Sequence, residues 1–164
     1  MKLKGIFLIL GVLFFFSACN NTPSRIIKEA TVVFNVFKKE ASLEIFNLNG
    51  ELIKEYDIEL ADTPYERQTG LMYRTEMNSN HGMLFSFEDS ALRTFYMKNT
   101  LISLDIIFLN ESLEIISIYK NTTPNNESSI PSLVPAKYVL ELRSGQSELN
   151  QFTEGMKINY MSYE

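Results

Sequence analysis

Two acidic side chains of this chain lie in segments that are otherwise apolar. Asp105 occurs within residues 103–108 (SLDIIF), and Glu141 occurs within residues 138–142 (YVLEL). Successive residues of a β-strand point to opposite faces, and apolar residues occupy both faces here, so we expect both acids to be at least partly buried. A buried carboxylate needs hydrogen bonds, a cation or a proton. These acids are therefore the first candidates for a functional site.

The candidate partners of these acids are one arginine and one amide side chain. Arg74 follows the apolar residues 71–73, and its guanidinium can grip a carboxylate with two parallel hydrogen bonds. Asn99 is the second candidate partner of Asp105, and together with Thr100 it is expected to stabilise the turn before the next strand. We expect the two acids to share partners, because both occur in one small domain.

This polar group has a structural and a functional interpretation. In the structural one it is a satisfied hydrogen-bond network that fixes strand register, as buried polar groups usually are. In the functional one it is the floor of a pocket for a small polar ligand, such as a sugar or glycan fragment, on which an aromatic ring stacks. The ligand-binding residues are then Arg74, Tyr96, Asn99, Thr100, Asp105 and Glu141.

An alternative function is hydrolysis of an envelope glycan by two carboxylates acting as general acid and base. No residue spacing in the sequence supports this alternative, so a non-catalytic binding module is preferred and no catalytic residue is assigned. No metal site or cofactor is expected either. His81 is the single histidine, expected in a loop, whereas zinc requires three or four nitrogen or sulfur ligands.

The amino terminus has the pattern of a secretory signal. Two lysines within residues 1–4 precede an apolar stretch over residues 5–18, which is shorter than the roughly 20 residues that span a bilayer. The junction at residues 16–19 (FSAC) resembles a lipobox, which predicts that Cys19, the single cysteine, is acylated. An uncleaved amino-terminal anchor is the alternative.

The predicted organisation is therefore a signal peptide over residues 1–18, a lipidated tether over residues 19–30 and a single β-rich domain over residues 31–164. Lipidated Cys19 would place this domain in the cell envelope, facing the periplasm or the exterior. Removal of 18 of the 164 residues leaves 146, enough for one domain with a substantial core.

The charge of this mature chain is negative. Two of the 15 basic side chains lie in the signal, so 13 basic and 20 acidic side chains remain, a formal charge of −7. Binding of nucleic acid requires a cationic face, so nucleic acid is not an expected partner. The expected partners are the membrane, through Cys19, and a small polar ligand or an envelope protein. For the latter, the proline-containing loop over residues 121–135 is the candidate surface.

Short strands dominate the pattern of the mature chain. Asn49-Gly50 between two alternating runs predicts a hairpin. Thr63, Pro64 and Glu66 predict a short helix with a capping box that ends at Gly70. Further strands are expected at residues 31–37, 83–87, 93–98, 104–109, 113–119, 138–142 and 156–161, and a second short helix within residues 144–152.

This pattern predicts a mainly β fold. Because no long amphipathic helix is available to cover a parallel sheet, we expect a single antiparallel β-sandwich or partly closed barrel with one or two short helices. Short turns between the predicted strands also favour antiparallel neighbours.

Five spaced motifs carry a resemblance to a known bacterial family. They are residues 70–74 (GLMYR), 82–85 (GMLF), 95–100 (FYMKNT), 103–108 and 138–142, the last followed by Gly145. Over about residues 58–160 the chain resembles the domain of unknown function 192 family, which implies a compact β-rich fold and no assigned biochemistry. Tyr96 stands where that family usually has tryptophan, and Ser103 where it often has proline.

Overall fold

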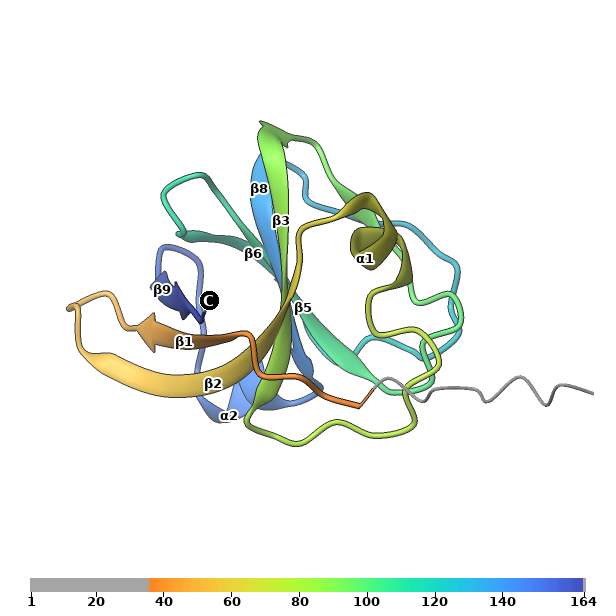
Figure 1. Ribbon diagram of the computed structural model, residues 1–164. Coiled ribbons are helices and arrows are strands. Elements are labelled where there is room, and N and C mark those ends of the chain that lie inside the picture. Colours follow the sequence, from red (N-terminus) through yellow and green to blue (C-terminus); the bar gives the residue numbers. More distant parts are fainter. Residues whose placement is uncertain (1–35, 164) are drawn as a thin grey trace, which may run out of the picture. The chain divides into compact units, whose positions relative to one another are not determined.

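The computed structural model describes residues 36–163 of the chain (Figure 1). The predicted signal peptide, Cys19, the tether and most of the strand expected at residues 31–37 lie outside these residues. Val36 and Phe37, the described end of that predicted strand, are not part of a strand. Within the described part of the chain, no helix has the length and apolar character needed to cross a membrane.

The domain is built on one seven-stranded sheet with the strand order β6-β5-β8-β3-β2-β1-β9. The strands of this sheet are β1 (Ala41–Phe46), β2 (Leu52–Ala61), β3 (His81–Ala91), β5 (Leu104–Leu109), β6 (Ile115–Tyr119), β8 (Ala136–Arg143) and β9 (Lys157–Ser162). A second, two-stranded sheet pairs β4 (Thr94–Phe95) with β7 (Ile130–Pro131). The predicted mainly β fold is confirmed.

The predicted hairpin at Asn49-Gly50 is confirmed as the connection between β1 and β2. The Asn47 side-chain oxygen accepts hydrogen bonds from the backbone N–H groups of Asn49 and Glu51, each at 2.9 Å. Gly50 has a φ of 82°, a left-handed conformation that glycine adopts without steric cost. Local turn chemistry therefore fixes the register of this hairpin.

The first predicted helix is also confirmed. Helix α1 (Pro64–Thr69) has Thr63 at its N-cap, with the reciprocal Thr63–Glu66 hydrogen bonds of a capping box. After α1 the chain crosses back before it enters β3, so β2 and β3 pair in parallel. The sheet is therefore mixed, whereas short turns led us to expect antiparallel neighbours throughout; the crossover through α1 is the long connection that a parallel pair requires.

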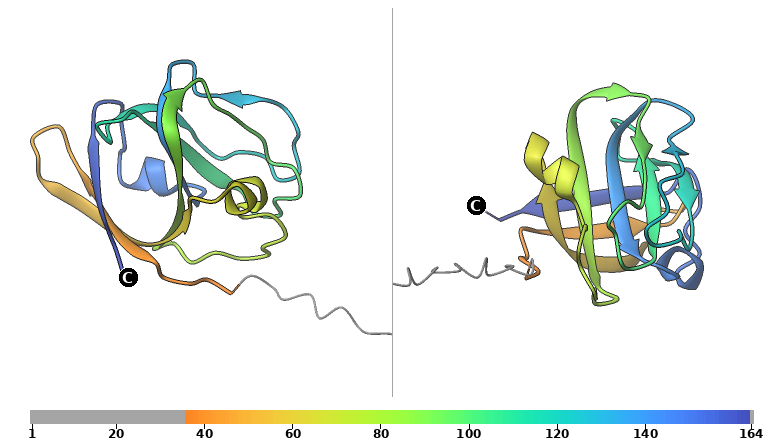
Figure 2. Two further views of the ribbon diagram at one scale, coloured as in Figure 1. Left: turned by 45° about the horizontal axis from the view of Figure 1, so that its top comes forward. Right: turned by 90° about the vertical axis from the view of Figure 1, so that its right-hand side faces the viewer.

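Apolar clusters cover both faces of the sheet. One cluster contains Tyr56, Leu140 and Phe152, and the other contains Phe85, Met97 and Val139. Helix α2 (Gln146–Leu149) lies on the first face, while α1 and the small sheet lie on the second (Figures 1 and 2). All six residues of β5 are buried as a result.

The two edge strands of the large sheet meet at one end. Glu114, next to β6, forms an isolated antiparallel bridge with Lys157 of β9, and the Ile115 N–H donates to the Met156 carbonyl at 2.8 Å. The sheet curls toward closure at this point without closing into a barrel.

Candidate functional site

Asp105 is fully buried on β5 and its carboxylate is satisfied by backbone groups. It accepts hydrogen bonds from the N–H groups of Asn121 at 2.9 Å, Gly145 at 3.2 Å and Ser147 at 2.7 Å. The expectation that Arg74 and Asn99 are its partners is wrong. Asp105 instead holds the start of α2 and the turn at Asn121 against the sheet, which is a structural role.

Asp105 and Glu141 lie on opposite faces of the sheet. Strand register pairs Asp105 with Leu142 and Ile106 with Glu141. Directly paired residues point to the same face, and neighbours along a strand point to opposite faces. The expectation that the two acids share partners is therefore wrong, and they cannot flank one scissile bond as a general acid and base.

A row of side chains on the second face includes Glu59 of β2, Met83 of β3 and Glu141 of β8, which are paired in register across three strands. Arg74, from the loop after α1, places its Nη1 against the Glu59 carboxylate in a buried ion pair. The Lys38 N–H donates to the other Glu59 oxygen at 3.2 Å. Glu59 was not among the predicted site residues, although it lies between the apolar residues Ile58 and Leu60.

Glu141 is only 5% exposed, and within residues 36–163 no backbone N–H donates to its carboxyl, in contrast to that of Asp105. Burial raises the pKa of Glu141 to about 8, and the nearby Arg74 charge opposes this rise. No hydrogen bond from residues 36–163 contributes to the pKa shift. Because this pKa lies above 7, the protonated form of the carboxyl is favoured at neutral pH.

A cavity of about 170 Å³ lies above Glu141. Four aromatic residues contribute to its walls, and Thr100 is one of the polar residues that line it. Phe95, one of the wall residues, packs edge-on against Phe85 with 5.1 Å between ring centroids. We call this cavity the Glu141 cavity. Its lining residues include Phe85, Phe87, Phe95, Tyr96, Thr100 and Glu141.

The structure thus brings together three of the six predicted ligand-binding residues. Tyr96, Thr100 and Glu141 line the same cavity, and Tyr96 is 44% exposed. Arg74 contributes charge to Glu141 but lines neighbouring cavities. Asp105 is on the opposite face.

Two hydrogen bonds join Asn99 to Tyr73, and we call this pair the Tyr73–Asn99 clasp. The Tyr73 N–H donates to the Asn99 carbonyl at 2.8 Å, and the Asn99 amide donates to the Tyr73 hydroxyl at 2.9 Å. Both residues have left-handed backbones, with φ of 55° for Asn99 and 64° for Tyr73. The predicted turn is confirmed, because the Thr100 N–H donates to the Met97 carbonyl at 3.1 Å. The clasp holds the loop after α1 against this turn.

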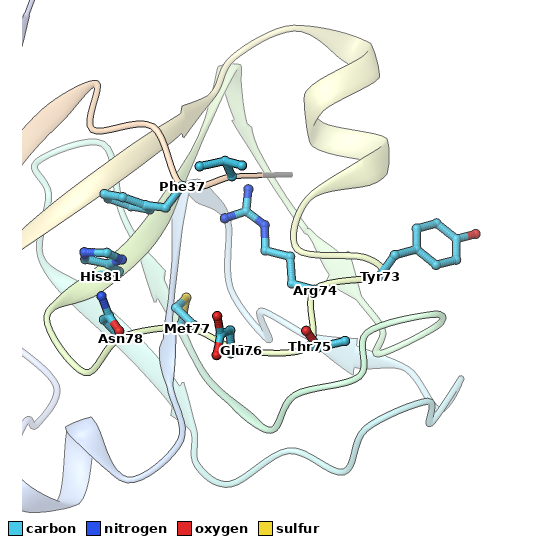
Figure 3. Close-up of a pocket in the computed structure, with 9 residues that line it drawn as sticks. Phe37, Tyr73, Arg74, Thr75, Glu76, Met77, Asn78 and His81 are labelled. Atoms are coloured by element: carbon cyan, nitrogen blue, oxygen red, sulfur yellow. The ribbon is translucent and has the colours of Figure 1, made fainter. Parts of the chain in front are cut away.

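A second and larger cavity, of about 470 Å³, has Arg74 among its lining residues (Figure 3). The rings of Phe37 and His81 stack at its edge, with 3.6 Å between centroids and an interplanar angle of 13°. His81 is the first residue of β3, not the loop residue we expected. No sequence pattern indicated this cavity, because the cavity depends on the contact between Phe37 and His81, which are 44 positions apart.

The described residues contain no group of three histidine, cysteine, aspartate or glutamate side chains placed to hold a metal ion.

Comparison with known families gives a match over most of the domain. The family model DUF192, described as "Uncharacterized ACR", matches residues 44–160, which begins earlier than the resemblance at about residue 58 and includes most of the first hairpin. A comparison with curated proteins gave no match.

Two solved structures share the fold. A protein from Sinorhizobium meliloti 1021, described as a proposed transcription regulator, is 33% identical, with a TM-score of 0.72 over 76% of this chain and 96% of that chain. A protein of unknown function from Novosphingobium aromaticivorans DSM 12444 is 32% identical, with a TM-score of 0.68 over 72% of this chain and 83% of that chain.

Proposed function

The chain belongs to the DUF192 family, and from this premise we propose that its domain is a non-catalytic module that binds a small, uncharged polar ligand in the Glu141 cavity. One sugar unit of a glycan is the ligand class that fits best. The observation that carries the proposal is the contrast between two buried acids: Asp105 has three backbone donors, and Glu141 has none among the residues that the structure describes.

The protonation state of Glu141 suits a hydroxylated ligand. A protonated carboxyl donates one hydrogen bond and accepts others, as does the Thr100 hydroxyl. A sugar hydroxyl can satisfy both functions of the carboxyl. Because a buried polar group without a partner is unfavourable, such a ligand would stabilise the folded domain.

The shape and size of the cavity favour a single ring. Binding sites for drug-sized ligands occupy roughly 300–1,000 Å³, whereas the Glu141 cavity measures about 170 Å³. Phe95 and the half-exposed Tyr96 supply flat apolar surfaces, against which the C–H face of a sugar ring can pack.

The charges near the cavity favour an uncharged ligand. Arg74 is not among the residues that line this cavity, and its Nη1 is paired with Glu59. Arg67, which also lines the cavity, directs its guanidinium to the backbone carbonyls of Asp62 and Ser86 and lies 5.4 Å from the Phe87 ring centroid. A neutral ligand leaves these arrangements undisturbed.

Two other functions are less well supported. Hydrolysis by a carboxylate pair requires a second acid across the bond, and Asp105 faces away from Glu141. The Sinorhizobium protein's description does not transfer to nucleic-acid binding by this chain, because the chain carries a formal charge of −5.

We also propose that acylated Cys19 anchors the domain in the cell envelope, where glycans are abundant ligands. The lipobox-like residues 16–19 support this part of the proposal. Mass spectrometry of the membrane fraction tests it: a mature chain that begins at lipidated Cys19 is expected, whereas an intact Met1 terminus would contradict it.

A thermal-shift screen of the full chain against neutral monosaccharides and soluble glycan fragments tests the binding function. We expect at least one neutral sugar to raise the Tm of the parent protein and of Tyr65→Ala, a control at an exposed tyrosine of α1. Tyr96→Ala and Thr100→Val should lose this response. No response of the parent protein to any sugar would count against the proposal.

A further inference from the structure

The larger cavity beside Arg74 has the size and chemistry of a second ligand site. Its volume of about 470 Å³ falls within the range typical of small-molecule sites, and Glu141 is not among its lining residues. Its walls come from the start of the described chain, from the loop over residues 73–78 and from His81. We refer to it below as the Arg74 cavity.

One side of the Arg74 cavity is apolar. The stacked Phe37 and His81 rings form this side, and Met77, which is 9% exposed, lies beside them (Figure 3). Tyr73 points away from the other lining side chains in the same view. The apolar surface can accept an aliphatic side chain of a ligand.

Arg74 supplies positive charge with hydrogen-bond donors to spare. Its side chain is only 7% exposed, and its Nη1 contacts Glu59. A guanidinium has five N–H donors, and the Arg74 Nε makes no hydrogen bond with the residues that the structure describes. The guanidinium lies near Phe37 in Figure 3, at the apolar side of the cavity. A carboxylate that enters there gains a charge-assisted partner.

Glu76 supplies the opposite charge from the same loop. It is exposed, lines the cavity and lies between Thr75 and Met77 along the loop that Figure 3 shows. A ligand with only negative charge is opposed by Glu59 and Glu76, and a ligand with only positive charge is opposed by Arg74. A ligand that carries one charge of each sign can satisfy both Arg74 and Glu76.

We propose that the Arg74 cavity binds a short zwitterionic peptide with apolar side chains. Its carboxylate lies against Arg74 and its ammonium group against Glu76. One side chain packs on Phe37 and Met77, and the Asn78 amide, which also lines the cavity, is available to the peptide group. The volume exceeds what one amino acid fills and suits a dipeptide.

Isothermal titration calorimetry of the full chain with the dipeptide Leu-Leu tests this proposal. The N-acetyl and C-amide forms of Leu-Leu each lack one charge. We expect Leu-Leu to bind and each blocked form to bind about tenfold more weakly, since each loses one charge-assisted contact. Absence of binding by Leu-Leu at millimolar concentration, or equal affinity for all three forms, would overturn the proposal.

Variants at the exposed acid keep the test independent of folding. Glu76→Gln should bind Leu-Leu and N-acetyl-Leu-Leu with equal affinity and still discriminate against the amide. Glu55→Gln, at an exposed acid of β2 outside the cavity, should discriminate as the parent does. If Glu76→Gln also keeps the full preference for the free amine, the assignment of the ammonium site is wrong. No sugar is present in this experiment, so its outcome is separate from that of the sugar screen.

Discussion

Asp105 and Glu141 lie on adjacent strands, one position apart in register, and point to opposite faces of the sheet. The first accepts three backbone hydrogen bonds, whereas the second has only the nearby Arg74 charge. Two acids with the same sequence signal therefore have different roles. Asp105 holds the start of α2 and the turn at Asn121 against the sheet, and Glu141 is the residue that we propose to contact a ligand.

Asp105→Asn should destabilise the domain by about 3 kcal/mol, because hydrogen bonds to a charged group are each worth roughly 1.5–3 kcal/mol and the new amide would face N–H donors. Urea unfolding of the parent and the variant at pH 7 measures this change. Asp62→Asn, at an exposed acid, is the control and should change stability little. If Asp105→Asn lost no more stability than the control, the attachment of α2 to the sheet would not depend on Asp105.

Glu141→Gln should change how stability depends on pH. The Glu141 carboxyl has a pKa of about 8 in the folded protein, against an ordinary value of 4.5. Between these pH values the folded state holds a proton that the unfolded state has lost, so stability falls as the pH rises, by a factor of up to about ten in the unfolding equilibrium constant per unit.

Urea unfolding of the parent and of Glu141→Gln at pH 5, 7 and 8.5 measures this difference. The variant cannot ionise at this position, so its stability should fall less over the range, and its advantage over the parent should be largest at pH 8.5. Parallel pH profiles of the two proteins would show that Glu141 ionises normally in the folded state.

Asn99 should tolerate glycine better than alanine. Its φ of 55° is a left-handed conformation that glycine adopts freely and alanine does not, while both substitutions remove the amide bond to Tyr73. We expect Asn99→Ala to be less stable than Asn99→Gly by about 1 kcal/mol. Thermal unfolding of the pair isolates the backbone contribution, and equal Tm values would contradict a strained clasp.

Gly82→Ala should destabilise the sheet. A Cβ atom at Gly82 would lie 2.7 Å from Leu142 Cδ2 and 3.0 Å from the Glu141 carbonyl oxygen, so β3 and β8 would have to separate. Overpacking of this kind costs roughly 1–3 kcal/mol. Gly145→Ala is the comparison, since its φ of 87° is strained for alanine but no atom lies within 4 Å of the added carbon. Equal stability of Gly82→Ala and the parent against denaturant would contradict the close approach of β3 and β8 at Gly82.

Local signals in the sequence predicted the local structure well. The Asn49-Gly50 hairpin, the Thr63 capping box and the short helix after Gly145 each depend on residues within a few positions of one another. The parallel pairing of β2 and β3 was missed, because strand direction there depends on where the loop after α1 returns to the sheet.

The candidate site was only half predictable for the same reason. Burial of Asp105 and Glu141 followed from their apolar neighbours, but their partners depend on register across strands far apart in sequence. The donors to Asp105 are backbone N–H groups, which every residue carries and which no side-chain pattern can identify. Arg74 forms its ion pair with Glu59 of β2, which lies two strands from β8. This strand order is defined by the folded sheet and cannot be inferred from the sequence pattern.

A ¹³C NMR titration of the side-chain carboxyl groups, with and without the neutral sugars of the screen, would show directly whether Glu141 is protonated and contacts a ligand. We expect the Glu141 resonance to titrate well above pH 4.5 and to shift when a sugar that binds is added. The Asp105 resonance should not respond to the sugar, because Asp105 lies on the opposite face of the sheet. A Glu141 resonance that titrates near 4.5, or that no sugar perturbs, would contradict a ligand site at this carboxyl.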